Sequence, residues 1–214
     1  MATEYWARNA YQDKTVAEKY DAERFNSLKG RIEDLLEKKA LKKGLALLPP
    51  KSRILEVPVG TGRISEYILQ KGFYLTGIDI SQEMLSLAHN KLSHFNETCS
   101  LKAGDAEKLP FQEETFDGVV SVRLFGHLPL EKKRLVLREF AKVSRSYVIV
   151  SIPIANTLRG YYRRFFKRLP MWFPITVQEM NYEAEQTGLK VIEIIPIFGC
   201  VSETAFVIMK NQVQ

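Results

Sequence analysis

Glycines and an acidic residue stand together near position 60, where a short apolar run ends. The run 53–59 reads as a strand and leads into the turn Gly60-Thr61-Gly62. Glycines let the backbone of such a turn pass close to a ligand without side-chain obstruction. Glu56 lies just before the turn, where a carboxylate repels a phosphate and attracts a cation. The pattern therefore predicts a site for a ligand with a positive end.

Two further acids follow at the ends of the next predicted strands. Asp79 lies close to the ~20-residue offset at which an acid binds ribose hydroxyls in nucleotide-binding folds. A carboxylate can accept both hydrogen bonds of a cis diol. Asp105 precedes the apolar segment Leu109-Pro110-Phe111, and it can accept from the amino group of an adenine held between apolar neighbours. The three acids together predict a nucleoside-like ligand.

A dinucleotide is the competing ligand for the glycine turn. Dinucleotide-binding folds use Gly-x-Gly-x-x-Gly and hold a pyrophosphate at the start of the next helix. Here Ser65 replaces the third glycine, and Arg63 is the only basic residue beside the turn. Asp79 suits either ligand. These features disfavour an NAD(P)-dependent oxidoreductase, which stays open as the alternative enzyme class.

Such a site needs strands that end at one edge of a sheet, and the hydrophobic patterning predicts them. Predicted strands cover 53–59, 73–80, 100–103, 116–122 and 147–152. Helices are predicted between them at 63–70, from Ser81 onward and at 130–143, with another at 176–187. This alternation favours a doubly wound parallel sheet. The last strands, 190–197 and 203–210, are joined by a turn that permits only antiparallel pairing, so we expect one antiparallel strand near the edge.

The chain before this alternation is predicted to be helical. One helix runs through 16–30, with Tyr20 and Phe25 as candidates to face a substrate. A second places Ile32, Leu35, Leu36, Ala40, Leu45 and Leu48 on its apolar side and stops at Pro49-Pro50. Lysines 38, 39, 42 and 43, offset by the nearby acids, are predicted to form a solvated face. We expect a single domain: 1–48 as a helical lid, 49–155 as the ligand-binding core, 156–174 as an insertion, and 175–214 as closing helix and strands.

The composition fits one folded domain in a reducing compartment. The 214 residues are 45% hydrophobic and 26% charged, which excludes global disorder. Cys99 and Cys200 form no disulfide or zinc pattern, so we expect no metal. The N-terminus has no apolar segment typical of a signal peptide, and no run approaches the ~20 residues of a membrane span. We expect a cytoplasmic protein, with peripheral membrane contact as a possible addition.

The formal charge of +6 is concentrated in the insertion 156–174. Arg159, Arg163, Arg164, Lys167 and Arg168 alternate there with aromatic residues. Three interpretations are open: a lid over the site, an interfacial helix at 159–173 that touches anionic lipid, and an RNA-binding segment. No separate RNA-binding module accompanies the segment, which disfavours nucleic acid.

Four segments in order, ILEVPVGTGR, GIDIS, GDAEKLPF and FDGVVSVRLFGHL, resemble those of the class I S-adenosylmethionine-dependent methyltransferases. The resemblance covers roughly 47–152 and is strongest to members with small-molecule or quinone-type substrates. It implies a Rossmann-like sheet of seven strands, S-adenosylmethionine as cofactor and S-adenosylhomocysteine as product. The acceptor would be small, and hydrophobic or lipid-linked. A methyltransferase-like module that only regulates or scaffolds is the non-enzymatic alternative.

The resemblance also implies roles for individual residues. Glu56 and the glycine turn would lie against the methionine part, Asp79 would hold the ribose, and Asp105 would contact adenine. The full implied cofactor set is Glu56, Val57, Pro58, Gly60, Thr61, Gly62, Asp79, Ile80, Met84, Asp105, Ala106, Val122 and Arg123. Pro58 stands where the family usually has glycine, and proline lacks an N–H and fixes φ. We take it as a tolerated substitution.

Two residues after the fourth strand are candidates for catalysis or acceptor binding. Methyl transfer from a sulfonium is an in-line displacement that needs mainly alignment, so no catalytic dyad is required. His127 is a candidate base near pH 7, or else a structural loop histidine. Arg123 is a candidate for binding an anionic group of the acceptor, or else closes a salt bridge over the sheet. The sequence leaves the acceptor and the oligomeric state open.

Overall fold

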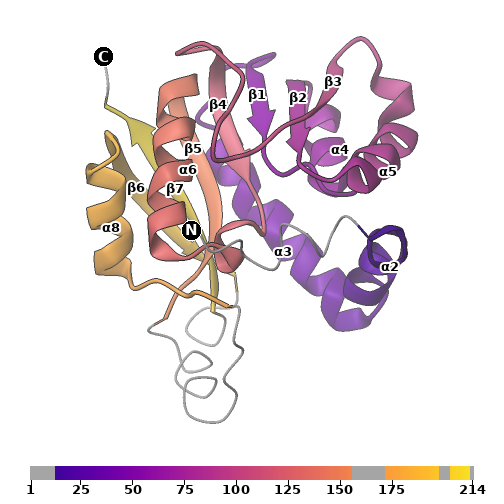
Figure 1. The fold of residues 1–214 in the computed structure, drawn as a ribbon, viewed down its shortest axis with the longest axis horizontal. Helices are drawn as coiled ribbons and strands as arrows, with labels where there is room; N and C mark the ends of the chain where they lie inside the picture. The colour runs from indigo at the N-terminus through magenta and orange to yellow at the C-terminus, as the bar shows by residue number, and fades with distance from the viewer. Residues whose placement is uncertain (1–12, 156–171, 198–202, 213–214) are drawn as a thin grey trace.

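The computed structural model describes residues 13–155, 172–197 and 203–212, and these form one sheet with helices on both faces (Figure 1). The strands are β1 (Arg53–Glu56), β2 (Tyr74–Asp79), β3 (Cys99–Ala103), β4 (Phe116–Ser121), β5 (Ser144–Pro153), β6 (Leu189–Pro196) and β7 (Thr204–Asn211). Within the described residues the sheet has seven strands, in the order β3-β2-β1-β4-β5-β7-β6. β7 pairs antiparallel with β5 and β6, while the other pairings are parallel. The predicted α/β sheet with one antiparallel strand is confirmed.

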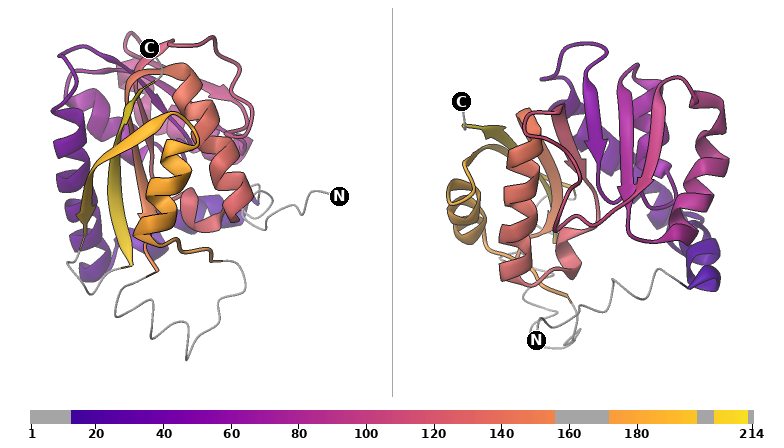
Figure 2. Two further views of the ribbon diagram at one scale, coloured as in Figure 1. Left: turned by 90° about the vertical axis from the view of Figure 1, so that its left-hand side faces the viewer. Right: turned by 45° about the horizontal axis from the view of Figure 1, so that its top comes forward.

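Helices cover the two faces of the sheet unequally. The helices are α2 (Lys14–Phe25), α3 (Leu28–Leu45), α4 (Arg63–Gln70), α5 (Gln82–Leu92), α6 (Leu130–Val143) and α8 (Val177–Glu185), with short 3-10 turns at η1 (Ser93–Phe95) and η2 (Phe125–His127). The edge-on view in Figure 2 (left) shows α3 on one face and α6 with α8 on the other. None of the described helices is long and apolar enough to cross a membrane.

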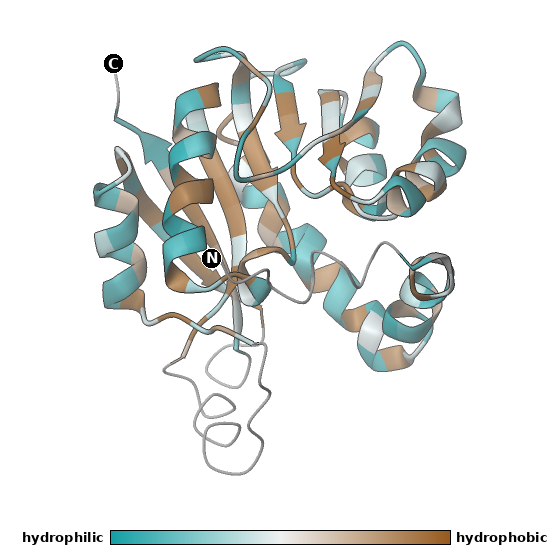
Figure 3. Cartoon of the chain, in the orientation of Figure 1, coloured by the Kyte–Doolittle hydropathy of each residue, from teal (hydrophilic) through white to brown (hydrophobic). Residues whose placement is uncertain are grey.

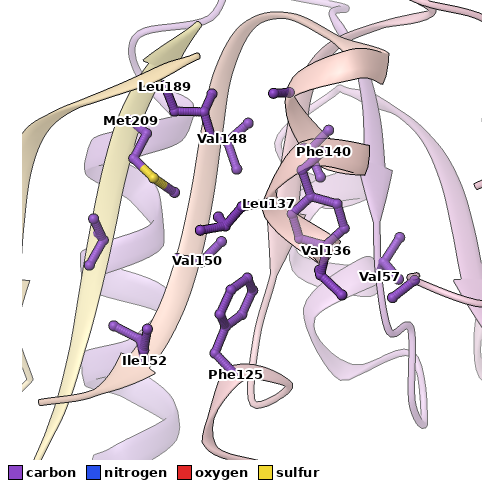
Figure 4. Close-up of a cluster of buried hydrophobic side chains, with 14 of the residues drawn as sticks. Val57, Phe125, Val136, Leu137, Phe140, Val148, Val150, Ile152, Leu189 and Met209 are labelled. Atoms are coloured by element: carbon purple, nitrogen blue, oxygen red, sulfur yellow. The ribbon is translucent and has the colours of Figure 1, made fainter. Parts of the chain in front are cut away.

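Each face has its own hydrophobic core. Under α6, Val136, Leu137 and Phe140 pack toward Val148 and Val150 of β5 (Figure 4). On the other face, α3, α4 and α5 bury apolar residues against the same strands. Burying each such side chain contributes about 1.5–3 kcal/mol. Because both faces are covered, the middle strands read as continuous apolar runs, which is why the sequence pattern located them.

The N-terminal helices depart from their predicted form. The predicted helix 16–30 is confirmed as far as Phe25, where α2 ends. It is wrong beyond that point, because Ser27 caps α3 by accepting from the Gly30 N–H at 3.0 Å. A Cβ on Gly30 would lie 1.9 Å from the Arg24 carbonyl oxygen, so glycine is needed where α2 turns back onto α3. This break separates α2 from the part of α3 that packs on the sheet.

The predicted apolar side of α3 is also wrong in part. Ala40, Leu41 and Leu45 are buried, but Ile32 and Leu35 are exposed. Lys39, Lys42 and Lys43 are exposed as predicted, whereas Glu37 is only 2% exposed and does not offset them. A Cβ on Gly44 would lie 2.6 Å from Cδ1 of Ile149, so the C-terminal half of α3 belongs to the core rather than to a lid.

Candidate functional site

A cleft with about 810 Å³ of space, including its opening to solvent, lies at the carboxyl ends of β1, β2 and β4. Its lining residues are Tyr20, Glu56, Pro58, Val59, Gly60, Thr61, Arg63, Ile64, Asp79, Ile80, Met84, Val122, Arg123, Leu124 and His127. Most of the predicted ligand-binding residues therefore come together in one place. Tyr20 brings α2 to the same cleft, and the Thr61 hydroxyl donates to Asp21 of α2 at 2.8 Å.

The glycine turn presents bare backbone to the cleft. Gly60 and Gly62 both have positive φ, at 53° and 80°, a conformation that other residues adopt only with strain. A Cβ on Gly60 would meet nothing within 4 Å, whereas one on Gly62 would contact Ala88 and Leu92 of α5 at 3.2–3.3 Å. Gly60 therefore leaves ligand space open, and Gly62 permits close packing of the turn on α5.

Asp79 fixes this turn from the neighbouring strand. Its Oδ2 accepts from the Gly60 N–H at 2.8 Å, and its Oδ1 accepts from the Ser81 N–H at 2.9 Å. Burial raises the pKa of Asp79, while these backbone hydrogen bonds lower it. Because each oxygen has two lone pairs, the carboxylate can still accept hydrogen bonds from a diol on its cleft side.

Glu56 is a buried carboxyl group at the bottom of the cleft. Its Oε2 accepts from the Ser65 hydroxyl at 2.5 Å. Burial raises the pKa of Glu56 to about 8, against the opposing effects of Ser65 and Arg63. Ser65, which replaces the third glycine of the dinucleotide pattern, is thus the hydrogen-bond partner of Glu56. A cation bound in the cleft would favour the ionised form of Glu56.

An ion-pair network closes the cleft on the side of α3. Glu37 accepts a hydrogen bond from Nη2 of Arg63 at 2.7 Å and forms an ion pair with Nη2 of Arg123, also at 2.7 Å. Arg63 also pairs with Asp34. The ring of Phe25 lies under both guanidinium groups, with centroid distances of 4.3 and 5.1 Å. The salt bridge offered above as one alternative for Arg123 is present, and its partner comes from the N-terminal helix α3.

His127 lies on η2 against an aromatic residue from far along the chain. The centroid of its ring lies 5.6 Å from that of the Trp172 ring, and the two rings are nearly perpendicular. Burial, together with the charges of Arg24, Arg123 and Lys133, lowers the pKa of His127 to about 4. The imidazole is therefore neutral at pH 7 and a weak proton acceptor, which favours a structural or positioning role over that of a base.

Lys133 connects η2 to the chain around Phe173, and it was not identified from the sequence. Its Nζ donates to the carbonyl oxygens of Leu128 and Phe173, both at 2.6 Å. Burial lowers the pKa of Lys133 to about 8. Lys133 falls on the apolar stripe of α6 with Val136, Leu137 and Phe140. A lysine within an apolar stripe is the sequence feature that could have identified it as a buried, hydrogen-bonded residue. The contact holds the chain after the undescribed stretch 156–171 against η2.

A second cavity, with about 360 Å³ of space including its opening to solvent, adjoins the cleft. Its lining residues are Arg24, Glu37, Arg123, Gly126, His127, Ser151, Ile152, Pro153, Trp172 and Thr204. Arg123 and His127 line both spaces. The site therefore consists of an acidic cleft and a smaller cavity with apolar and cationic walls, which meet at these two residues.

Comparisons with known proteins agree with this geometry. A family model described as a methyltransferase domain matches residues 54–146. A demethylmenaquinone methyltransferase from Thermotoga maritima is 29% identical over 74% of this chain and 68% of its own length. A phosphatidylethanolamine N-methyltransferase from Cereibacter sphaeroides is 41% identical over 44% of this chain and 45% of its own. The chain thus spans only part of these relatives.

Solved structures share the complete fold. The magnesium protoporphyrin IX methyltransferase ChlM from Synechocystis, solved with bound S-adenosylhomocysteine, has a TM-score of 0.73 at 15% identity, covering 93% of this chain and 100% of that chain. The CcbJ methyltransferase from Streptomyces caelestis has a TM-score of 0.75 at 16% identity, covering 96% of this chain and 99% of that chain. Residues 54–146 thus match the methyltransferase domain family, and the chain has the fold of these methyltransferases.

Four of the predicted cofactor-binding residues are absent from the cleft lining: Val57, Gly62, Asp105 and Ala106. Ala106 lies in the core with Leu109. Oδ1 of Asp105 accepts from the Glu107 N–H at 2.9 Å and closes a turn. The Gly104 N–H donates to the Asp79 carbonyl oxygen at 3.0 Å, which keeps this turn beside the cleft. Contact between Asp105 and adenine stays a prediction.

The described residues include no group of three His, Cys, Asp or Glu side chains placed to share a metal. The prediction that it needs no metal stays untested. Cys99 is a half-buried free thiol. Cys200 and the cationic residues 159–168 lie outside the described residues.

Proposed function

We propose that this protein binds S-adenosylmethionine in the cleft and transfers its methyl group to a small acceptor in the adjoining cavity. The observation that carries the proposal is the buried pair of acids, Glu56 and Asp79, at a turn whose Gly60 leaves open space. A ligand with an ammonium group and a ribose diol, and without phosphate, fits these donors and acceptors.

The ion pairs of Arg63 argue against a dinucleotide in the same cleft. Arg63 directly follows the glycine turn, and it is engaged by Glu37 and Asp34. A pyrophosphate would have to break these pairs and would face Glu56. This supports the methyltransferase over the NAD(P)-dependent oxidoreductase.

The residues present suggest a division of labour. The bound cofactor would supply a methyl group activated by its sulfonium. Glu56 would hold the ammonium group, Asp79 the ribose hydroxyls, and Met84 would pack against the adenine. Glu37 would hold Arg63 and Arg123 in place and exclude water from the side of α3. His127 would form part of the wall between cleft and cavity and orient the acceptor by packing rather than by taking a proton.

The acceptor is proposed to be hydrophobic or lipid-linked. Ile152, Pro153 and Trp172 give the second cavity an apolar wall, and the relatives named for demethylmenaquinone and phosphatidylethanolamine are compatible with such an acceptor. Membrane contact through 159–173 stays a prediction, since 159–171 lies outside the described residues.

Calorimetry with S-adenosylhomocysteine tests the proposal. We expect the wild-type protein to bind it, and Asp79→Ala to weaken binding at least about tenfold, the factor that corresponds to ~1.4 kcal/mol. A well-folded wild type that binds NAD and not S-adenosylhomocysteine would contradict the proposed function. Transfer of labelled methyl groups from S-adenosylmethionine to a cell lipid extract then separates an enzyme from a scaffold, because a scaffold binds cofactor without transferring.

A further inference from the structure

The side of α3 that faces away from the cleft carries exposed apolar residues. Leu28, Ile32 and Leu35 are 76%, 41% and 66% exposed. Residues at i, i+4 and i+7 lie on one face of a helix, so the three side chains form a continuous stripe. Scattered exposed leucines are ordinary, but three neighbours on one face leave apolar surface without a partner among the described residues.

Basic residues flank this stripe. Helical spacing places Arg31 beside Leu28 and Leu35, and Lys39 and Lys42 one and two turns beyond Leu35. All three cations are exposed, and within the described residues none of them makes an ion pair. Hydrophobic and hydrophilic residues alternate along α3 in Figure 3.

The acids of the same helix point the other way. Glu37 pairs with Arg63 and Arg123, and Asp34 pairs with Arg63 and Lys38. Glu33 lies 3.9 Å from Arg123 and 3.8 Å from Lys29. The arginines of the cleft thus draw all three acids of α3 to the inner side, and the outer side keeps only cations.

This combination matches the chemistry of an anionic lipid surface. Interfacial helices place an apolar stripe at the boundary of headgroups and acyl chains, with Lys and Arg beside it. Here the helix is already formed and held on the sheet by Ala40, Leu41 and Leu45, so docking needs no folding step. The positive outer side complements anionic headgroups and would repel a basic protein.

We propose that the outer face of α3, formed by Leu28, Arg31, Ile32, Leu35, Lys39 and Lys42, docks peripherally on an anionic lipid surface. The cleft side of the same helix holds Glu37, so the protein would rest on lipid by the back of the helix that closes its site. This proposal does not depend on the methyl-transfer proposal, since vesicle binding needs no cofactor.

Co-sedimentation with vesicles tests it. The vesicles are pure phosphatidylcholine, or phosphatidylcholine with a third of phosphatidylglycerol. We expect the wild type to bind only the anionic vesicles. The variant Arg31→Glu/Lys39→Glu/Lys42→Glu should bind at least about tenfold less, because each basic residue near such a surface favours binding roughly fivefold. Leu28→Gln/Ile32→Gln/Leu35→Gln should show a similar loss.

A matched control has the same change of charge elsewhere. Lys108→Glu/Lys190→Glu/Lys210→Glu replaces three exposed lysines that make no ion pair within the described residues, and it should keep at least half of the binding. The α3 variants should keep the wild-type melting temperature and bind S-adenosylhomocysteine as the wild type does. If neither the wild type nor any variant bound S-adenosylhomocysteine, the proposed function would be contradicted. The vesicle-binding result would still stand, because it does not depend on cofactor binding.

Several outcomes would overturn the docking proposal. One is an equal loss in the control triple, which would assign binding to net charge alone. Another is retention by both α3 variants with loss in Arg163→Glu/Arg164→Glu/Lys167→Glu, which would assign binding to the insertion. A third is absence of vesicle binding together with a dimer that the glutamine variant dissolves, which would make the stripe a self-association surface.

Discussion

At the scale of single residues, the site is defined by the positions of the Glu56 and Asp79 carboxyl groups and by their hydrogen-bond partners. Asp79 accepts hydrogen bonds from two backbone N–H groups, whereas Glu56 accepts one from the Ser65 hydroxyl. A buried acid with a raised pKa is poised to respond to a charged ligand. Glu56 is therefore the group most sensitive to a cation in the cleft.

Glu56 should couple cofactor binding to pH. The pKa of Glu56 is about 8 without ligand, and a bound ammonium lowers it, so binding below pH 8 releases a proton. The affinity for S-adenosylhomocysteine should rise between pH 6 and 8, by at most about tenfold per pH unit. Calorimetry in buffers of different ionisation enthalpy measures the released proton.

Glu56→Gln should bind more weakly and without this pH dependence, whereas Glu97→Gln at an exposed position should behave as the wild type. Since the folded-state pKa lies above the unfolded value of 4.5, burial of Glu56 costs stability progressively as pH rises from about 4.5 to 8. Glu56→Gln should therefore melt higher than the wild type at pH 8. A wild type that takes up or releases no proton on binding at pH 7 would contradict this account.

At the scale of elements, α3 has two tasks along its length. Its C-terminal part packs against β5 and β7, and Asp34 and Glu37 in its middle hold the arginines that border the cleft. Its interior acids stabilise the cleft wall through charge-assisted hydrogen bonds, which are stronger than neutral ones. The helix is thus a fixed part of the site and carries α2 with it.

Removing the Glu37 charge should loosen this wall. Glu37→Gln leaves two guanidinium groups without their shared partner, and breaking a buried pair costs about 3–5 kcal/mol. We expect a loss of stability near 3 kcal/mol, because glutamine keeps one acceptor, and a roughly tenfold weaker affinity for S-adenosylhomocysteine, a change of ~1.4 kcal/mol. Urea unfolding and calorimetry measure the two effects.

Glu193→Gln is the matched control for Glu37→Gln. It removes an exposed pair of the same helix, Lys43–Glu193 at 3.2 Å, and exposed pairs contribute about 0–1 kcal/mol. Equal effects of the two substitutions would show that α3 makes no special contribution to the cleft.

At the scale of the whole molecule, distant segments meet at η2. The chain after position 171 returns to this turn, where the Phe173 N–H donates to the Gly126 carbonyl oxygen at 2.9 Å. A Cβ on Gly126 would lie 2.4 Å from the ring of Trp172, so the return is close. Lys133 joins the segments at Leu128 and Phe173 to α6 and thereby connects the core under α6 to the wall of the second cavity.

Lys133→Met should weaken this connection. The substitution leaves the carbonyl oxygens of Leu128 and Phe173 without their donor, and an unsatisfied buried polar group costs about 1–3 kcal/mol. Urea unfolding should show a loss in this range, with cofactor binding largely kept because Lys133 does not line the cleft. Lys142→Met, which removes a partly exposed pair with Glu139, should cost less than 1 kcal/mol. The opposite order of stabilities would contradict the role of Lys133.

Local patterns in the sequence were enough to determine the sheet and the acidic half of the site. Strand and helix periodicity depend on neighbouring residues, and the covered faces of the sheet made the signal strong. Glu56 and Asp79 end β1 and β2, and Gly60 follows β1. The carboxyl ends of these strands must meet in a parallel sheet, so the convergence of the three residues follows from topology.

Only the tertiary structure decided which side of α3 is buried and what fixes the cleft wall. Helical spacing gives both a stripe through Ile32 and Leu35 and another through Asp34 and Glu37. The partners that select between them, Arg63 and Arg123, come from distant segments of the chain. The same holds for Ser65 with Glu56 and for Lys133 with Phe173. Long-range pairing of buried polar groups depends on positions in space, and no local pattern encodes it.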